Sequence, residues 1–189
     1  MCCDGRIEGS PARRDLPAMD DTAHFPALAE RVAALPWADV ARDLDAHGAA
    51  MIASLLSPRD CETVAGGYAD DLLFRSRVVM SRHGFGRGEY RYFAYPLPEL
   101  VADLRAAFYP PLAAIANRWN ATLGIEGRYP AEHATFLAQC HADGQTRPTS
   151  LLLQYGAGDY IRLHQDLYGE HVFPLQVAVL LSEIGRAHV

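Results

Sequence analysis

The residues best suited to chemistry are His164 and Asp166, which are separated by a single residue. Side chains alternate along an extended backbone, so this His-x-Asp spacing puts both on one face of a strand. An imidazole and a carboxylate on one face can supply two of the three ligands of a facial triad for non-haem Fe(II). The alternative is a surface His–Asp pair on a hairpin. The flanking sequence favours the metal, because apolar runs lie on both sides and Gly156 and Gly158 provide a turn.

The elements that must position this pair lie in the last third of the chain. Apolar runs alternate with turn residues between Leu151 and Glu183. This pattern predicts a strand, a tight turn, a second strand, a loop and a third strand. The other predicted non-helical segments are short strands at residues 49–55 and 74–81, a glycine-rich loop at residues 83–91, an extended segment at residues 92–95 and a loop at residues 143–148.

Helices are predicted mainly in the first two thirds of the chain. Ser57 followed by Pro58 is typical of the N-cap and first turn of a helix. Pro110 and Pro111 should divide the longest apolar helical pattern into two helices, because proline removes a backbone donor. The predicted helical regions are residues 27–35, 37–47, 58–70 and 98–123, and residues 131–140 fit either a strand or a helix.

The order of these elements, with helices first and strands late, indicates the α+β class. The chain has 189 residues, half of them hydrophobic, which suits a single domain with a sizeable core. We expect that domain to span residues 19–183. Residues 1–18 are polar and should form a disordered extension. Residues 184–189 should be a non-native tail, because one back-translation of them reads as a common sequencing adapter.

The composition excludes several classes of protein. A formal net charge of −6 argues against a protein that coats nucleic acid generally, although a local basic patch is compatible with it. The four cysteines have no paired spacing, which favours reduced thiols over zinc ligands or a disulfide framework. The sequence has no apolar run of membrane-spanning length and no signal-peptide core. We therefore expect a cytoplasmic protein that does not bind membranes.

The stretch around the His-x-Asp triplet resembles the start of the double-stranded β-helix (jelly roll) of 2-oxoglutarate- and Fe(II)-dependent oxygenases. It is most similar to the bacterial branch grouped with AlkB-type alkylation-damage demethylases, which have an Asn-x-Tyr strand, a glycine turn and a Leu-His-x-Asp segment. The chain departs from that pattern at Leu153, where the family has asparagine. Residues 74–183 also resemble an uncharacterised prokaryotic family of this superfamily, through RHGFGRGEYRYFAYPLP and QTRPTSLLLQYGAGDY. The matching positions are Tyr155, Gly158, Leu163, His164, Gln165 and Asp166.

The resemblance implies a fold and a chemistry. N-terminal helices would pack on the first part of a jelly-roll core that is incomplete at the C-terminus. His164 and Asp166 would hold Fe(II), leaving positions for 2-oxoglutarate and O2. Tyr155 would donate a hydrogen bond to 2-oxoglutarate, with a core tyrosine as the alternative. The implied activity is oxidative demethylation of alkylated DNA or RNA bases. A hydroxylase of a small molecule or protein side chain, and a non-catalytic cupin-like binding module, are the alternatives.

The segment from Arg75 to Arg91 is a candidate for substrate contact. It holds five arginines against one acid, Glu89, and several aromatic residues lie in and after it. Such a segment can form a lid that contacts phosphates and stacks on a flipped base. The alternative is a solvated charged loop over the edge of an aromatic core. The candidate substrate residues are Arg87, Tyr90, Arg91, Gln165 and Tyr168.

Two groups that the resemblance requires are missing from the chain. The family uses a second histidine as an iron ligand and an arginine that clamps 2-oxoglutarate, both tens of residues beyond the His-x-Asp. His171 lies too close to Asp166 to serve as that ligand, and His188 falls in the expected tail. We therefore expect the chain to be a truncated oxygenase that is not catalytically competent by itself.

Overall fold

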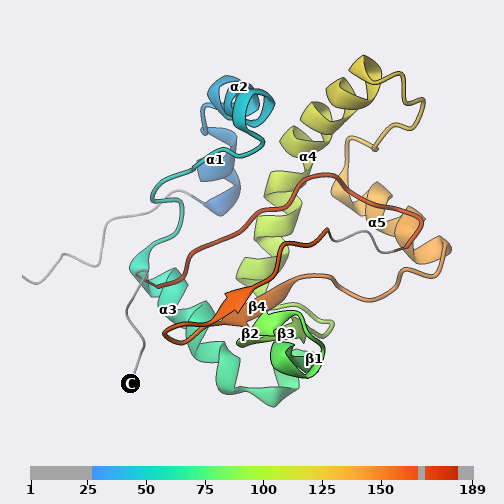
Figure 1. Cartoon of the computed structure of the whole chain (residues 1–189). Helices are drawn as coiled ribbons and strands as arrows, with labels where there is room; N and C mark the ends of the chain where they lie inside the picture. Colours follow the sequence, from blue (N-terminus) through green and yellow to red (C-terminus); the bar gives the residue numbers. More distant parts are fainter. Residues whose placement is uncertain (1–26, 166–168, 183–189) are drawn as a thin grey trace, which may run out of the picture.

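The computed structural model describes residues 27–165 and 169–182. Within that part the fold belongs to the predicted α+β class, with five α-helices and two small antiparallel sheets. Helix α4 (Glu99–Thr122) runs through the centre, and the other elements pack around it (Figure 1). No barrel is formed by the described residues, so the jelly-roll core stays a prediction. The expected extension at residues 1–18 and tail at residues 184–189 lie outside the described residues.

The three predicted N-terminal helices are confirmed, as α1 (Leu28–Ala33), α2 (Trp37–His47) and α3 (Pro58–Gly66). Helix α3 begins at a capping box. Asp60 N donates to Ser57 Oγ, and Ser57 N donates to Asp60 Oδ2, both over 3.1 Å. These two hydrogen bonds satisfy two backbone N–H groups, which have no partner within the helix at its start. Residues 131–140, which fitted either class, are largely helical in α5 (His133–Ala142).

The prediction that Pro110 and Pro111 divide the long helix is wrong, because α4 continues through both. Each internal proline costs about 3 kcal/mol. Large apolar side chains on both sides of the pair are buried, including Phe108 and Ile115. Burying each such side chain stabilises by about 1.5–3 kcal/mol, so several together offset the prolines. Ala106, whose carbonyl loses a partner to Pro110, is exposed and can be hydrated.

Two segments predicted as strands are irregular. Residues 49–55 form no strand, because Ser54 has a left-handed φ of +56° and Ile52 and Leu55 pack against the helices. The third strand predicted before Glu183 is also absent from residues 169–182, which pair with none of the described strands. That segment instead crosses α4, from beside α5 towards α3 (Figure 1).

The larger sheet has the strand order β1-β3-β4, with all neighbours antiparallel. The smaller sheet is a two-stranded ribbon of β2 and β5. The glycine-rich stretch at residues 83–91 is therefore not one loop, as predicted, but contains β2 and the start of β3. The predicted strand at residues 74–81 is confirmed by β1. The bounds are β1 Phe74–Val79, β2 Gly86–Arg87, β3 Glu89–Phe93, β4 Leu151–Gln154 and β5 Tyr160–Ile161.

Two clusters of buried side chains hold these layers together. The first joins α1 to the middle of α4, with Val32 packed among Phe108, Leu112 and Ile115. The second joins the larger sheet to the start of α4 and consists of Phe93, Val101 and Leu152. Among the described residues, no helix combines the length and the hydrophobicity that crossing a membrane would need.

Candidate active site

The predicted strand–turn–strand unit before His164 is confirmed by β4, a tight turn and β5. Gly156 N donates to Asp159 Oδ2 over 2.8 Å, and Asp159 N donates to Gly156 O over 3.1 Å. Gly158 has a φ of +78°, a conformation that favours glycine. The turn therefore brings the chain back from β4 and sends β5 towards His164.

His164 is exposed and follows β5 by three residues. Its Nδ1 lies 2.8 Å from the carbonyl oxygen of Arg162. A carbonyl can only accept, so Nδ1 carries the proton of this contact, and in the neutral ring Nε2 carries the lone pair. This tautomer, held by a backbone carbonyl, is the one that metal-ligating histidines commonly adopt.

The donor set for iron is only partly described. Asp166, the predicted second ligand, and Tyr168, a predicted substrate residue, lie outside the described residues. In residues 27–165 and 169–182, no group of three or more His, Cys, Asp or Glu side chains could hold a metal ion. The described part thus fits an iron site as the source of one imidazole ligand. A complete triad requires carboxylate and imidazole groups from elsewhere.

Tyr155 lies directly after β4 and is 42% exposed, outside both buried clusters. Partial burial and the nearby Asp159 carboxylate raise the pKa of its phenol. The hydroxyl therefore stays protonated at neutral pH and can donate a hydrogen bond, as its predicted role requires. A Cβ on Gly88 would lie 2.7 Å from the Tyr155 ring, so glycine at that position allows the ring to approach β3.

The role of the glycine-rich stretch was missed by the sequence reasoning. Arg162 N donates to Phe85 O over 2.8 Å, and Gly86 pairs with Ile161. A Cβ on Gly86 would lie 2.1 Å from Tyr160 O, so only glycine permits this pairing. The alternating glycines were the available signal, since glycine in a strand often marks a close approach of backbones. The stretch that contains Arg87 is thereby fastened to the chain that leads to His164.

The predicted substrate residues do not share one surface. Arg87 and Gln165 are exposed. Tyr90 and Arg91 are adjacent in β3 and therefore project from opposite faces of the sheet. Arg91 Nη1 donates to Asp71 Oδ1 over 2.6 Å, and its guanidinium lies 4.8 Å from the centre of the Tyr68 ring. Arg91 thus lies on the face of the sheet that packs on the core, where its contacts are with the protein itself.

A second polar group on that face was also not predicted. Tyr68 OH donates to Glu89 Oε1 over 2.7 Å, and Arg77 donates to Glu89 Oε2. Burial and the bond to Glu89 raise the pKa of Tyr68 to about 12. Burial opposes ionisation of Glu89, but the bonds from Arg77 and Tyr68 outweigh it and lower the pKa of that carboxyl. This group joins β1, β3 and the chain after α3.

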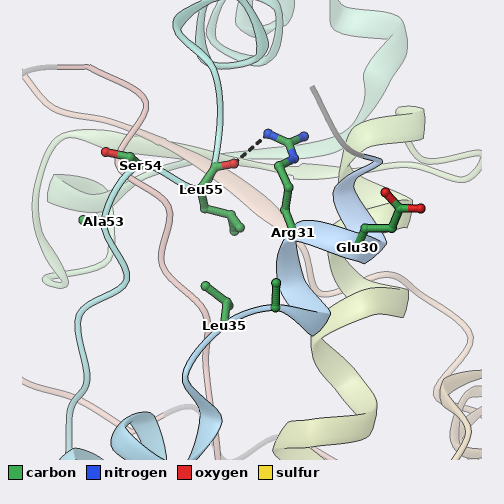
Figure 2. A pocket seen from close by; sticks show the side chains of 7 residues that line it. Glu30, Arg31, Leu35, Ala53, Ser54 and Leu55 are labelled. Carbon is green, nitrogen blue, oxygen red and sulfur yellow. Dashed lines mark hydrogen bonds between the residues drawn. The ribbon is translucent and has the colours of Figure 1, made fainter. Parts of the chain in front are cut away.

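Two cavities among the described residues lie away from the predicted site residues. One of about 490 Å³ is lined mainly by apolar groups of α1 and the segment after α2 (Figure 2). The guanidinium of Arg31, which lines this cavity, donates a hydrogen bond to Leu55 O over 2.7 Å and forms an ion pair with Asp60. The other, of about 330 Å³, lies between α2, α4 and residues 175–180. Neither cavity contains His164 or Tyr155, so the candidate site at the β4–β5 hairpin depends on the imidazole and the phenol and not on a cavity.

Comparison with known proteins gives a family and two relatives. Residues 88–189, more than half of the chain, match a family described as "Oxygenase, catalysing oxidative methylation of damaged DNA". Two uncharacterized proteins of Mycobacterium tuberculosis, from strains CDC 1551 and H37Rv, are each 52% identical over 91 residues. The aligned part is 48% of this chain and 39% of each relative, so the chain spans about two fifths of their length. No solved structure matches the chain.

Proposed function

The chain belongs to this family of oxygenases of damaged DNA, and from that premise we propose that it is part of an Fe(II)- and 2-oxoglutarate-dependent demethylase of alkylated bases. One observation carries the proposal. The matched segment contains His164, and the contact with Arg162 O favours the tautomer that metal-ligating histidines commonly adopt. The spacing to Asp166 then supplies the carboxylate of a facial triad.

Each residue of the candidate site has a separate task in this proposal. His164 and Asp166 would hold the iron, together with a ligand that the described residues do not contain. Tyr155 would donate a hydrogen bond from its phenolic hydroxyl to a carboxylate oxygen of 2-oxoglutarate. The hairpin turn between Gly156 and Asp159 would keep Tyr155 and His164 at a constant separation. Preorganised donors of this kind orient a cofactor without a cost of rearrangement when it binds.

Bound iron would supply an oxidation in which O2 converts 2-oxoglutarate to succinate and CO2 and hydroxylates the methyl group, whose carbon then leaves the base as formaldehyde. The chain's own residues would bind and orient the reactants. Nucleic acid is the favoured substrate because the family is described by its action on damaged DNA. A small molecule, a protein side chain and mere ligand binding remain as outcomes that an experiment can distinguish.

The test is demethylation by the full-length protein that contains this chain. The protein is incubated with Fe(II), 2-oxoglutarate and an oligonucleotide carrying a methylated base, and the oligonucleotide mass and succinate are measured. We expect loss of a methyl group that depends on both additions and is coupled to succinate. Succinate without a change in the oligonucleotide would move the substrate to another class. Absence of both, from folded and iron-loaded protein, would contradict the proposal and favour a binding module.

A further inference from the structure

Residues 171–173, which follow the proposed iron ligands in the sequence, are fastened to the end of α5. The Gln145 side chain accepts a hydrogen bond from His171 N over 2.8 Å and donates one to His171 O over 3.3 Å. His171 Nε2 lies 2.5 Å from Asp143 Oδ2, and because a carboxylate only accepts, this ring nitrogen donates. The backbone and the ring of His171 are therefore both held by residues at or just after the C-terminal end of α5.

Tyr129 and Phe173 extend this attachment to α4. Tyr129 OH donates to Val172 O over 2.7 Å. Tyr129 is itself fixed to α4, because the Asn117 side chain accepts from Tyr129 N over 2.7 Å and donates to Tyr129 O over 2.9 Å. The centre of the Phe173 ring lies 4.9 Å from that of Tyr129 and 5.9 Å from that of Phe136. We call these contacts of residues 171–173 with the α4–α5 region the helix anchor.

The same glutamine also lies close to Gly169. Gly169 has a φ of +80°, a conformation that favours glycine. A Cβ at that position would lie 2.4 Å from Gln145 Nε2, so the absence of a side chain leaves room for the glutamine amide. Gln145 therefore lies against the chain at residue 169 as well as at residue 171, on the side of the helix anchor that is nearer in sequence to the proposed ligands.

A second attachment precedes the proposed ligands. Arg162 N donates to Phe85 O over 2.8 Å, and β5 pairs with β2. His164 and Asp166 therefore lie, in sequence, between two segments that are each fastened to the rest of the fold. A chain that is held at both ends has fewer conformations, so less entropy is lost when two of its side chains bind one ion.

We propose that Tyr129, Asp143 and Gln145 are positioning residues for the iron centre, because they fix the far end of the segment that carries His164 and Asp166. The inference rests on the proposed function and adds to it three residues that act through the backbone of the metal-binding segment. With the helix anchor open, the two ligands sample arrangements that do not bind one ion together. The apparent metal affinity then falls in proportion to the fraction of molecules in which the anchor is closed.

The first test is amide hydrogen exchange at His171 in the full-length protein, with and without Co(II), whose visible absorption reports its binding. An ion that binds only when the helix anchor is closed must also stabilise the closed anchor. Saturating Co(II) should therefore slow exchange of the His171 amide about tenfold or more, and His164→Ala should remove this effect. The control is the Gly48 amide, which donates to Leu44 O at the end of α2 and should exchange at an unchanged rate.

The second test is the Co(II) affinity of two variants whose folding is checked by circular dichroism. Tyr129→Phe combined with Gln145→Ala removes three hydrogen bonds of the helix anchor and leaves a ring at position 129. This double variant should bind Co(II) about tenfold more weakly. Asp45→Ala is the matched control, because it removes polar contacts of the same kind with Arg118 and Trp119 between α2 and α4. Its Co(II) affinity should equal that of the unsubstituted protein.

The outcomes separate this inference from the proposed function. Co(II) that binds without slowing exchange at His171 would overturn the inference and leave the proposed function intact. Unchanged affinity in the folded double variant, or an equal loss of affinity in Asp45→Ala, would do the same. Equally tight Co(II) binding by His164→Ala, or no Co(II) binding by the unsubstituted protein, would overturn the assignment of the iron ligand and the inference with it.

Discussion

Replacing Gly86 with alanine should open the β2–β5 ribbon while the helices remain folded. Gly86 has a φ of +142°, which residues with a side chain rarely adopt. The new Cβ would lie 2.1 Å from Tyr160 O and 3.0 Å from Ile161 Cα. Both neighbours are backbone atoms, so the strands must separate because no side chain can rotate away.

The expected cost follows from these contacts. Backbone strain of this kind costs about 1–3 kcal/mol. Separation of the strands also removes the bond from Arg162 N to Phe85 O, with a net loss of about 1 kcal/mol. The sum is about 3 kcal/mol, equivalent to about a 100-fold shift towards the open ribbon. Gly84 provides a matched control, because its φ is +71° and a Cβ there meets nothing within 4 Å. Alanine at position 84 should cost about 1 kcal/mol, from backbone strain alone.

Amide hydrogen exchange measures this opening directly. The Arg162 amide should exchange up to about 100-fold faster in Gly86→Ala, and less than about tenfold faster in Gly84→Ala. Amides in the middle of α4 should keep their protection in both variants. Equal exchange at Arg162 in the two variants would refute the steric argument, and loss of protection throughout α4 would refute the local character of the ribbon.

Two other contacts give predictions of their own. The Gln145 side chain accepts a hydrogen bond from His171 N over 2.8 Å and donates one to His171 O over 3.3 Å. Gln145→Ala should therefore accelerate amide exchange at His171 about 10- to 30-fold. Gln139→Ala, on the exposed surface of α5, should leave that exchange unchanged. Equal exchange at His171 in the two variants would contradict the role of Gln145. Burial, with a smaller contribution from Arg105, lowers the pKa of His133 from its ordinary value of 6.5. The unfolded chain then binds a proton at His133 more readily than the folded chain does. The free energy of unfolding should therefore be at its full value above pH 6.5 and fall as the pH drops below it. Urea denaturation midpoints measured across this pH range test the prediction, and an equal fall in His133→Gln would contradict it.

Local signals in the sequence predicted the parts of the fold that depend on neighbouring residues. Ser57 and Pro58 marked the start of α3, because a capping box needs only the first turn of its own helix. The glycine turn before His164 was predicted for the same reason, since Gly158 and Asp159 complete it within a few residues. The candidate imidazole could therefore be found from the sequence alone.

Contacts between distant segments decided what the sequence could not predict. Pro110 and Pro111 remain inside α4 because other elements bury the apolar residues around them. Arg91 looked equivalent to Arg87 in sequence, yet strand pairing turns Arg91 towards Tyr68 and Asp71. The residue types of Gly86 and Ile161 do not indicate that these two residues pair in the sheet. The arrangement of the site around His164 thus depends on pairings over more than seventy residues, which no local pattern records.

The most direct test of the central claim is iron-dependent demethylation by the full-length protein with single histidine substitutions. His164→Ala is compared with His47→Ala, because His47 is exposed at the end of α2 and belongs to no proposed site. Methyl loss from the oligonucleotide and binding of Fe(II) are both measured. We predict that His164→Ala abolishes methyl loss and weakens iron binding, and that His47→Ala changes neither. Full activity and unchanged iron affinity in His164→Ala would contradict the assignment of His164 as an iron ligand.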